Sequence, residues 1–133
     1  MSARTGSTHK ILLIFQTQIN AQAEELKAAV KSLRQEYRLE RLSSVYLAYS
    51  PTSKPTNPSG RLSVAGTFLV EDSPIQVQKR LRESKIQNPY AAEVTLALFD
   101  DETIMSPDLT IPHPELHVRP DWLIPASEIW GDY

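Results

Sequence analysis

The chain has 133 residues, a formal net charge of −2 and no cysteine. This length suits one domain with its own hydrophobic core, and the absence of cysteine excludes disulfides, thiolate nucleophiles and cysteine-ligated zinc. The weak charge excludes a general attraction to nucleic acid or to an anionic membrane, and no apolar run reaches the roughly 18 residues of a membrane span.

The first part of the chain predicts a buried strand followed by a helix. Residues 1–9 are polar and are expected to be disordered. They lack the apolar segment of a signal peptide, so we expect a cytoplasmic protein with a single domain over residues 10–133. Residues 10–15 form an apolar run that is typical of a strand buried on both faces. Asn20 is then a candidate helix N-cap, and apolar side chains recur at helical spacing up to Tyr37.

The middle of the chain predicts a hairpin. Residues 42–49 alternate loosely and predict a second strand, and residues 62–70 predict a third, in which Gly66 favours a bulge or a close approach. The segment between them is rich in proline and serine and ends at Gly60. We interpret this segment as a mobile hairpin loop rather than as a ligand for an SH3-type domain.

A second helix is predicted after the hairpin. Ser73 and Gln76 form a capping box, and Pro74 occupies the first helical position. The helix is expected to end near residues 88–89, where a proline follows an asparagine.

A fourth strand and a rigid loop follow. Residues 93–98 alternate between apolar and more polar side chains, which predicts a strand with one apolar face and places Glu93 and Thr95 on the same side. The acidic run 100–102 predicts a turn, and two prolines hold the segment around His113 extended.

The order of these elements is β-α-β-β-α-β. It predicts an α/β (α+β) fold of the ferredoxin-like type, with two helices on one face of a four-stranded antiparallel sheet. The tail after residue 105 holds five of the ten prolines. We therefore expect it to wrap the domain in extended form and to finish with a short turn near residues 127–130. Trp122 and Trp130 are interpreted as packing anchors, and a stacking platform is the alternative.

Two motifs in the last third of the chain carry a family resemblance. Residues 99–113 follow the pattern F-x-x-E-x-I-x-x-x-x-L-T-[VI]-P-H without a gap, and residues 119–129 continue R-x-x-x-L-x-P-x-x-E-I. In these motifs the chain resembles the 6-hydroxymethyl-7,8-dihydropterin pyrophosphokinases (HPPK) of folate biosynthesis. The remainder of the chain matches only as an order of elements. The resemblance implies an HPPK-like domain with an ancestry of Mg²⁺, ATP and pterin binding.

The metal positions of the resembled family are only partly kept. That family holds magnesium with two aspartates on its fourth strand, and the aligned residues are Glu93 and Thr95. One carboxylate therefore remains and the other has become a hydroxyl, which weakens the metal site. The alternative is that Glu93 is simply a solvent-facing strand residue.

Three other features of the family are missing. Its Gly-Ser-Asn turn after the first strand is replaced by residues 15–17, and residues 85–92 stand in place of its long basic loop. Its pterin-binding Tyr and Asn align with Leu62 and Val64, which can neither stack nor hydrogen-bond in the same way. Basic residues remain on the second helix, where a solvated face is the more typical interpretation: Lys79, Arg80, Arg82 and Lys85.

The nucleotide side of the family is retained best. Thr110, His113 and Arg119 match its nucleotide-side residues, and an arginine with an imidazole donor can receive a polyphosphate or another anion. Asp108 stands at a position that is usually basic and repels phosphate. A metal pair of His113 and His117 is disfavoured because the neighbouring prolines deny them a shared helical turn.

These residues together predict an HPPK-like protein with impaired or absent pyrophosphokinase activity, which acts as a binding or interaction module. One alternative is an active pyrophosphokinase that transfers pyrophosphate from ATP to the pterin. Another is an unrelated ferredoxin-like subunit that forms an oligomer. The cofactors implied by the resemblance are Mg²⁺ and ATP, or none at all. The expected partners are a nucleotide or another anion, and a protein or a second copy of the chain, with neither nucleic acid nor membrane.

Overall fold

The computed structural model describes residues 8–18, 23–49, 51, 54–56, 60–87 and 92–130. Its elements, in chain order, are β1 His9–Gln18, α1 Ala23–Glu36, β2 Arg38–Leu42, β3 Tyr46–Tyr49, β4 Gly60–Val70, α2 Pro74–Gln87, β5 Glu93–Phe99, β6 Ile104–Met105, β7 Thr110–Ile111 and α3 Pro120–Ile129. Within these ranges, no helix has both the length and the apolar character that a membrane crossing requires.

An antiparallel sheet with β1 in its interior forms the centre of the molecule. The strand order is β2-β4-β1-β5, and β3 also pairs with β4. β1 pairs with β4 along its whole length and with β5 on its other side. The pairing of β3 with β4 confirms the predicted hairpin.

The strand predicted over residues 42–49 is wrong in one respect, because two strands stand in its place. β2 begins at Arg38, directly after α1, and β3 begins at Tyr46. Ser43 lies at the break, where its N–H donates to the Ala65 carbonyl and its hydroxyl accepts from the Ala65 N–H, both at 2.8 Å. A side-chain hydrogen bond thus replaces one step of regular strand pairing.

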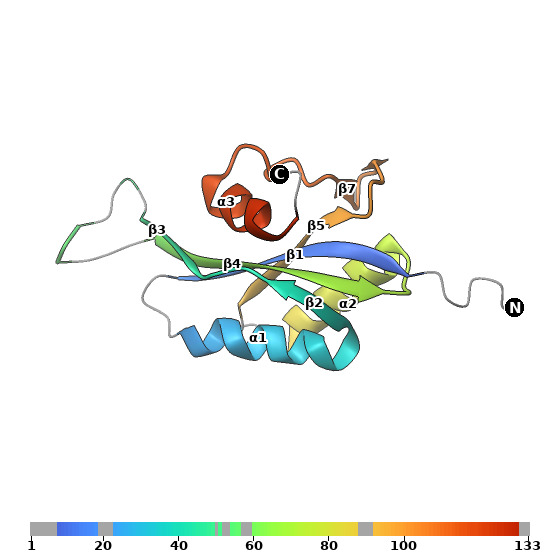
Figure 1. The fold of residues 1–133 in the computed structure, drawn as a ribbon, viewed down its shortest axis with the longest axis horizontal. Helices are drawn as coiled ribbons and strands as arrows, with labels where there is room; N and C mark the ends of the chain where they lie inside the picture. Colours follow the sequence, from blue (N-terminus) through green and yellow to red (C-terminus); the bar gives the residue numbers. More distant parts are fainter. Residues whose placement is uncertain are drawn as a thin grey trace, which may run out of the picture.

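Helices cover both faces of the sheet, with α1 and α2 on one face and α3 on the other (Figure 1). The prediction of an extended tail is therefore wrong for residues 120–129, and it is also wrong for residues 114–118, which form consecutive turns. Pro120 sits in the first turn of α3, where proline is well tolerated. Trp122, Ala126 and Ile129 recur at helical spacing and are buried against the sheet, and this packing stabilises the helix although Pro125 lies inside it.

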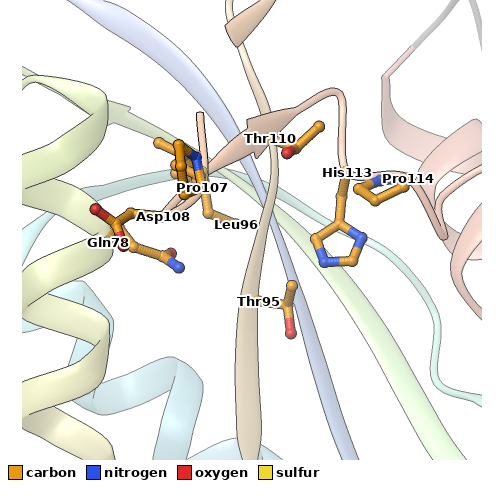
Figure 2. A pocket seen from close by; sticks show the side chains of 9 residues that line it. Gln78, Thr95, Leu96, Pro107, Asp108, Thr110, His113 and Pro114 are labelled. Atoms are coloured by element: carbon orange, nitrogen blue, oxygen red, sulfur yellow. The ribbon is translucent and has the colours of Figure 1, made fainter. Parts of the chain in front are cut away.

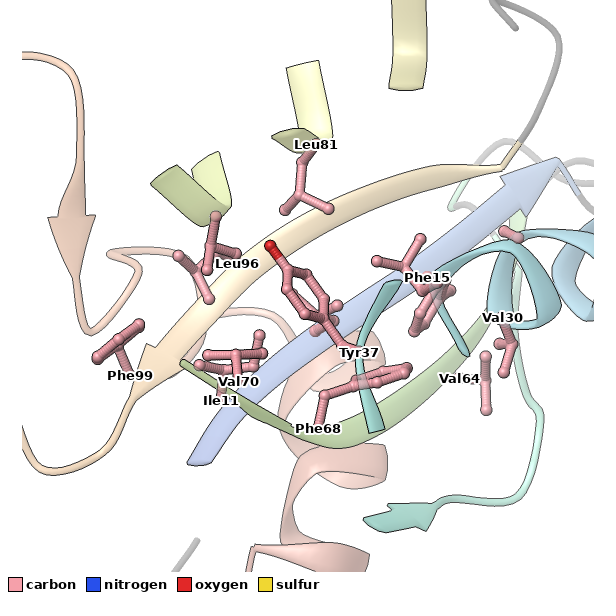
Figure 3. Packing of buried hydrophobic residues seen from close by; sticks show 14 of the residues in the cluster. Ile11, Phe15, Val30, Tyr37, Val64, Phe68, Val70, Leu81, Leu96 and Phe99 are labelled. Atoms are coloured by element: carbon pink, nitrogen blue, oxygen red, sulfur yellow. The ribbon is translucent and has the colours of Figure 1, made fainter. Parts of the chain in front are cut away.

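Each face has its own hydrophobic core. The larger core lies between the sheet and the helices α1 and α2, and it contains Tyr37, Phe68 and Phe99 (Figure 3). The smaller core lies under α3 and includes Trp122, which confirms the prediction of a packing anchor. The side chains of residues 11–15 alternate between the two cores and are all fully buried, as predicted for the first strand.

The alternation predicted for residues 93–98 is interrupted by a bulge. Leu13 pairs with Leu96 but Leu12 pairs with Leu98, so Ala97 is an extra residue on β5. Ala97 and Leu98 consequently both join the core under α3, whereas Leu96 joins the core under α1 and α2. The prediction that Leu98 shares a face with Leu96 is therefore wrong.

The capping box of the second helix is confirmed. The Ser73 N–H donates to Gln76 Oε1 at 2.8 Å, and the Gln76 N–H donates to Ser73 Oγ at 3.3 Å. His9, expected within a disordered terminus, is instead the first residue of β1, and its Nδ1–H donates to Asp100 at 2.7 Å. The predictions for residues 1–7, for Asn20, for residues 88–89 and for most of the hairpin loop lie outside the described residues.

Candidate functional site

A pocket of about 190 Å³ lies beside β5, the strand at one end of the sheet (Figure 2). Its lining comes from α2, from β5 and from the segment around β7: Gln78, Thr95, Leu96, Pro107, Asp108, Leu109, Thr110, His113 and Pro114. Three of the five residues predicted from the family motifs, Thr95, Thr110 and His113, therefore line one pocket. Glu93 and Arg119 do not line it.

A short hairpin holds the outer wall of the pocket in place. β6 and β7 pair antiparallel, and their turn is closed by Ser106, whose hydroxyl donates to the Leu109 carbonyl at 3.0 Å. Ile111 is fully buried, and the His113 N–H donates to the Ala97 carbonyl at 2.9 Å. The loop is thus fastened to the edge of β5, which brings Thr110 and His113 close to Thr95 (Figure 2).

His113 is half-buried and presents a neutral donor to its surroundings. Its Nδ1 accepts the Glu115 N–H at 3.1 Å, which places the proton of the neutral ring on Nε2. The ring meets the Trp122 ring edge to face at a centroid distance of 4.8 Å. Burial lowers the pKa of His113, with Glu115 opposing this effect and Arg119 adding to it. At neutral pH His113 is therefore a hydrogen-bond donor without a charge.

Arg119 lies on Trp122, with its guanidinium 4.8 Å from the ring centroid. Its Nη2 and Nε donate to the two oxygens of Asp121 at 2.7 and 3.2 Å, and its Nη1 donates to Glu115 at 3.5 Å. The hydrogen bond to Asp121 raises the pKa of Arg119. Two carboxylates thus surround the cation that the sequence predicts as an anion ligand.

Asp121 is the central acceptor of a polar chain on this face of the sheet. Besides Arg119 it accepts a hydrogen bond from Gln16 Nε2 at 2.8 Å, and the same nitrogen donates to Ser63 at 3.0 Å. Burial alone would raise the pKa of Asp121, but the hydrogen bonds from Arg119 and Gln16 hold it below its usual value. The carboxylate is therefore ionised at neutral pH.

The sequence interpretation missed Gln16, Gln78 and Asp121. Gln16 directly follows the apolar run of residues 11–15 in β1, and it is only 3% exposed. That departure from the apolar pattern was a usable signal. Asp121 and Gln78 gave none, because an acidic residue in the first turn of a helix and a glutamine on a helix face are common without any binding role.

The predicted metal residues lie on the strand but do not form a cluster of acidic ligands. Glu93 is exposed, and its Oε2 lies 3.5 Å from Arg61 Nη1. Among the described residues, the only group of three candidate metal ligands is His9, Asp100 and Glu102, whose ligand atoms lie within 4.8 Å of one another. This group is near the opposite end of β5 and does not include Glu93.

The positions aligned with the pterin side are apolar in the fold as well. Val64 is buried in the core under α1 and α2, and Leu62 packs against that core. On α2, Arg80 forms an ion pair with Glu36 at 2.8 Å and lies over the Tyr37 ring. These residues therefore contribute to packing on the face away from α3.

No protein-family model and no curated protein matches the chain. The proposed function therefore depends on the pocket beside β5. This pocket contains Thr95, Thr110 and His113, three of the residues predicted from the resemblance.

Proposed function

We propose that the chain is an HPPK-like nucleoside-binding or nucleotide-binding module with impaired or absent pyrophosphokinase activity. The observation that carries this proposal is the convergence of Thr95, Thr110 and His113 on one pocket. Thr95 lies on β5 and was predicted as a weak metal position, whereas Thr110 and His113 lie close together on the loop after β5 and were predicted as nucleotide-side residues. Their convergence favours an inherited ligand site over a chance cluster.

The arrangement of the sheet is consistent with the proposed ancestry. If β2 and β3 are counted as one edge, the order β2-β4-β1-β5 with antiparallel pairing is the order of the ferredoxin-like β-α-β-β-α-β fold. The helices α1 and α2 lie on one face, as that fold requires, and α3 is an addition on the other (Figure 1). This supports the ferredoxin-like part of the proposal, a fold that hosts many functions, and does not identify a ligand.

The chemistry of the pocket favours the heterocyclic base of a nucleoside. The side chains of Leu96 and Leu109 and the prolines of the loop supply apolar contact, while Gln78, Thr110 and His113 supply an amide, a hydroxyl and an imidazole N–H. At about 190 Å³ the pocket is smaller than the roughly 300–1,000 Å³ of pockets for drug-sized ligands. One ring system therefore suits it better than a whole nucleoside triphosphate.

Catalysis is proposed to be weak because charge neutralisation is incomplete. Phosphoryl transfer depends on metal ions and cations that offset the negative charge of the phosphates. Glu93 is a single carboxylate held near Arg61, and Arg119 is paired with Asp121. In addition, no lysine or arginine lines the pocket within the part of the chain that the structure describes.

NMR titration of the ¹⁵N-labelled chain with adenosine tests the proposal. We expect the backbone resonances of Thr95, Thr110 and His113 to shift together. Thr110→Val removes one hydroxyl at nearly constant shape and should weaken binding. Thr103→Val is the matched control, because Thr103 is exposed on the same segment and does not line the pocket.

Absence of any shift near the pocket at millimolar adenosine would overturn the proposal. If ATP with Mg²⁺ also causes no shift near the pocket, the alternative that the chain acts by binding another protein is favoured.

A further inference from the structure

Arg119 is a cation whose charge acts on His113, one of the residues that line the pocket. No lysine or arginine is part of the pocket lining among the described residues. The guanidinium of Arg119 and the imidazole of His113 both contact the ring of Trp122, each at 4.8 Å between centres. The charge of Arg119 also contributes to lowering the pKa of His113. The two groups therefore belong to one electrostatic environment.

The carboxylate of Asp121 already occupies the binding edge of this arginine. Nη2 and Nε of Arg119 donate to its two oxygens at 2.7 and 3.2 Å, which is the two-point geometry by which arginine holds a phosphate. The Asp121 side chain is only 13% exposed. Displacing it would leave a nearly buried carboxylate without its cation, which is strongly unfavourable.

Further contacts hold the Asp121 carboxylate where it is. The buried amide of Gln16 donates to Asp121 Oδ2 at 2.8 Å. Asp121 also lies in the first turn of α3, where the helix dipole stabilises a negative charge. Glu115 adds a second carboxylate 3.5 Å from Arg119 Nη1. Arg119 is therefore neutralised from two sides by the chain itself.

We infer that Asp121 is a built-in counter-anion that takes the place of a ligand phosphate at Arg119. Resting on the proposed function, this makes the pocket selective for an unphosphorylated nucleoside over its phosphate esters. The affinity of an uncharged nucleoside does not depend on the charge of Arg119, so the pairing of Arg119 with Asp121 does not weaken its binding. A phosphate group beside Arg119 instead meets the carboxylates of Glu115 and Asp121, which repel it.

NMR titration of the full chain at low salt with three probes, adenosine, AMP and inorganic pyrophosphate, tests this inference. The natural chain should bind adenosine at least as tightly as AMP and show no pyrophosphate-dependent shift at Arg119. Asp121→Asn keeps the shape of the side chain and removes its charge. It should raise the affinity for AMP and pyrophosphate by about tenfold, which equals about 1.4 kcal/mol, and leave the affinity for adenosine unchanged.

Tighter binding of AMP than of adenosine by the natural chain, with the difference lost in Arg119→Ala, would overturn the inference. An Asp121→Asn variant that gains no affinity for pyrophosphate would overturn it as well. If that variant does not fold, Glu115→Gln carries the same comparison with a smaller expected gain. Failure of adenosine to bind would count against the proposed function, while the pyrophosphate comparison still decides whether Asp121 masks Arg119.

Discussion

The two faces of the sheet differ in the size and polarity of the cores that cover them. Under α1 and α2 the core is large and apolar, and the Tyr37 hydroxyl at its rim donates to Asp72 at 2.8 Å. Under α3 the apolar core is smaller and is joined to a polar chain that runs from Gln16 through Asp121 to Arg119. β1 supplies side chains to both faces, so one strand links the large apolar core to the polar chain from Gln16 to Arg119.

The largest expected effect concerns the chemistry of the α3 face. The natural chain should form no AMP above background in a pyrophosphokinase assay with ATP, Mg²⁺ and the authentic pterin. The second metal-binding carboxylate and the long basic loop of the resembled family are missing. Each such group is typically worth on the order of 10²-fold or more in rate. Robust turnover that disappears in Glu93→Gln would show instead that this face is a working active site.

The next largest effect should come from the opposite face. Phe68→Ala removes a fully buried ring from the core under α1 and α2, and we expect a loss of about 3–5 kcal/mol in the free energy of unfolding. Urea denaturation measures this loss. A loss below about 1 kcal/mol would mean that this core does not dominate the stability.

A smaller loss of unfolding free energy is expected when the hydrogen bonds of the Gln16 amide are removed. Gln16→Leu removes the amide that donates to Ser63 and Asp121, and Ser63 is fully buried. Leaving such groups without a partner costs about 1–3 kcal/mol. Gln18→Leu is the matched control, because Gln18 is an exposed glutamine at the end of the same strand. Equal losses in both variants would contradict a specific contribution of the chain from Gln16 to Arg119.

The smallest effect is the contribution of Asp121 to the pH dependence of the free energy of unfolding. Its pKa is lowered in the folded state, so the folded protein binds this proton less readily than the unfolded chain does. The stabilisation is fully present above the unfolded pKa of about 3.9 and is lost as the pH falls through the folded pKa. Acid denaturation monitored by circular dichroism should therefore be less steep below about pH 4 in Asp121→Asn than in the natural chain.

The sequence predicted those parts of the fold that depend on local patterns. The apolar run of β1, the capping box at Ser73 and the β3–β4 hairpin were all legible. The helix α3 was not, because Pro125 argues against a helix and only the burial of Trp122 and Ile129 against the sheet outweighs it. The bulge at Ala97 was not predictable either, because polar and apolar residues alternate regularly in the sequence of residues 93–98 and give no sign of an extra residue.

The sequence predicted some members of the candidate site but not its charge balance. The family motifs selected Thr95, Thr110 and His113, and these residues lie together. The hydrogen bond between Gln16 and Asp121 joins residues 105 positions apart, and no local pattern encodes such a contact. Whether an arginine is available to a ligand depends on such distant partners, so a motif alone could not reveal that Arg119 is paired.

The break at Ser43 has a consequence for how the molecule behaves in a crowded solution. The β2 and β3 side of the sheet exposes large apolar side chains, with Leu47 at 50% and Tyr49 at 63%. An uninterrupted edge of this kind is a template on which strands of neighbouring molecules can add and aggregate. Here Ser43 divides the edge into two short strands, and β2 carries charged side chains such as Arg38 and Arg41. The break at Ser43 and the charges on β2 are both features by which sheet edges avoid edge-to-edge aggregation.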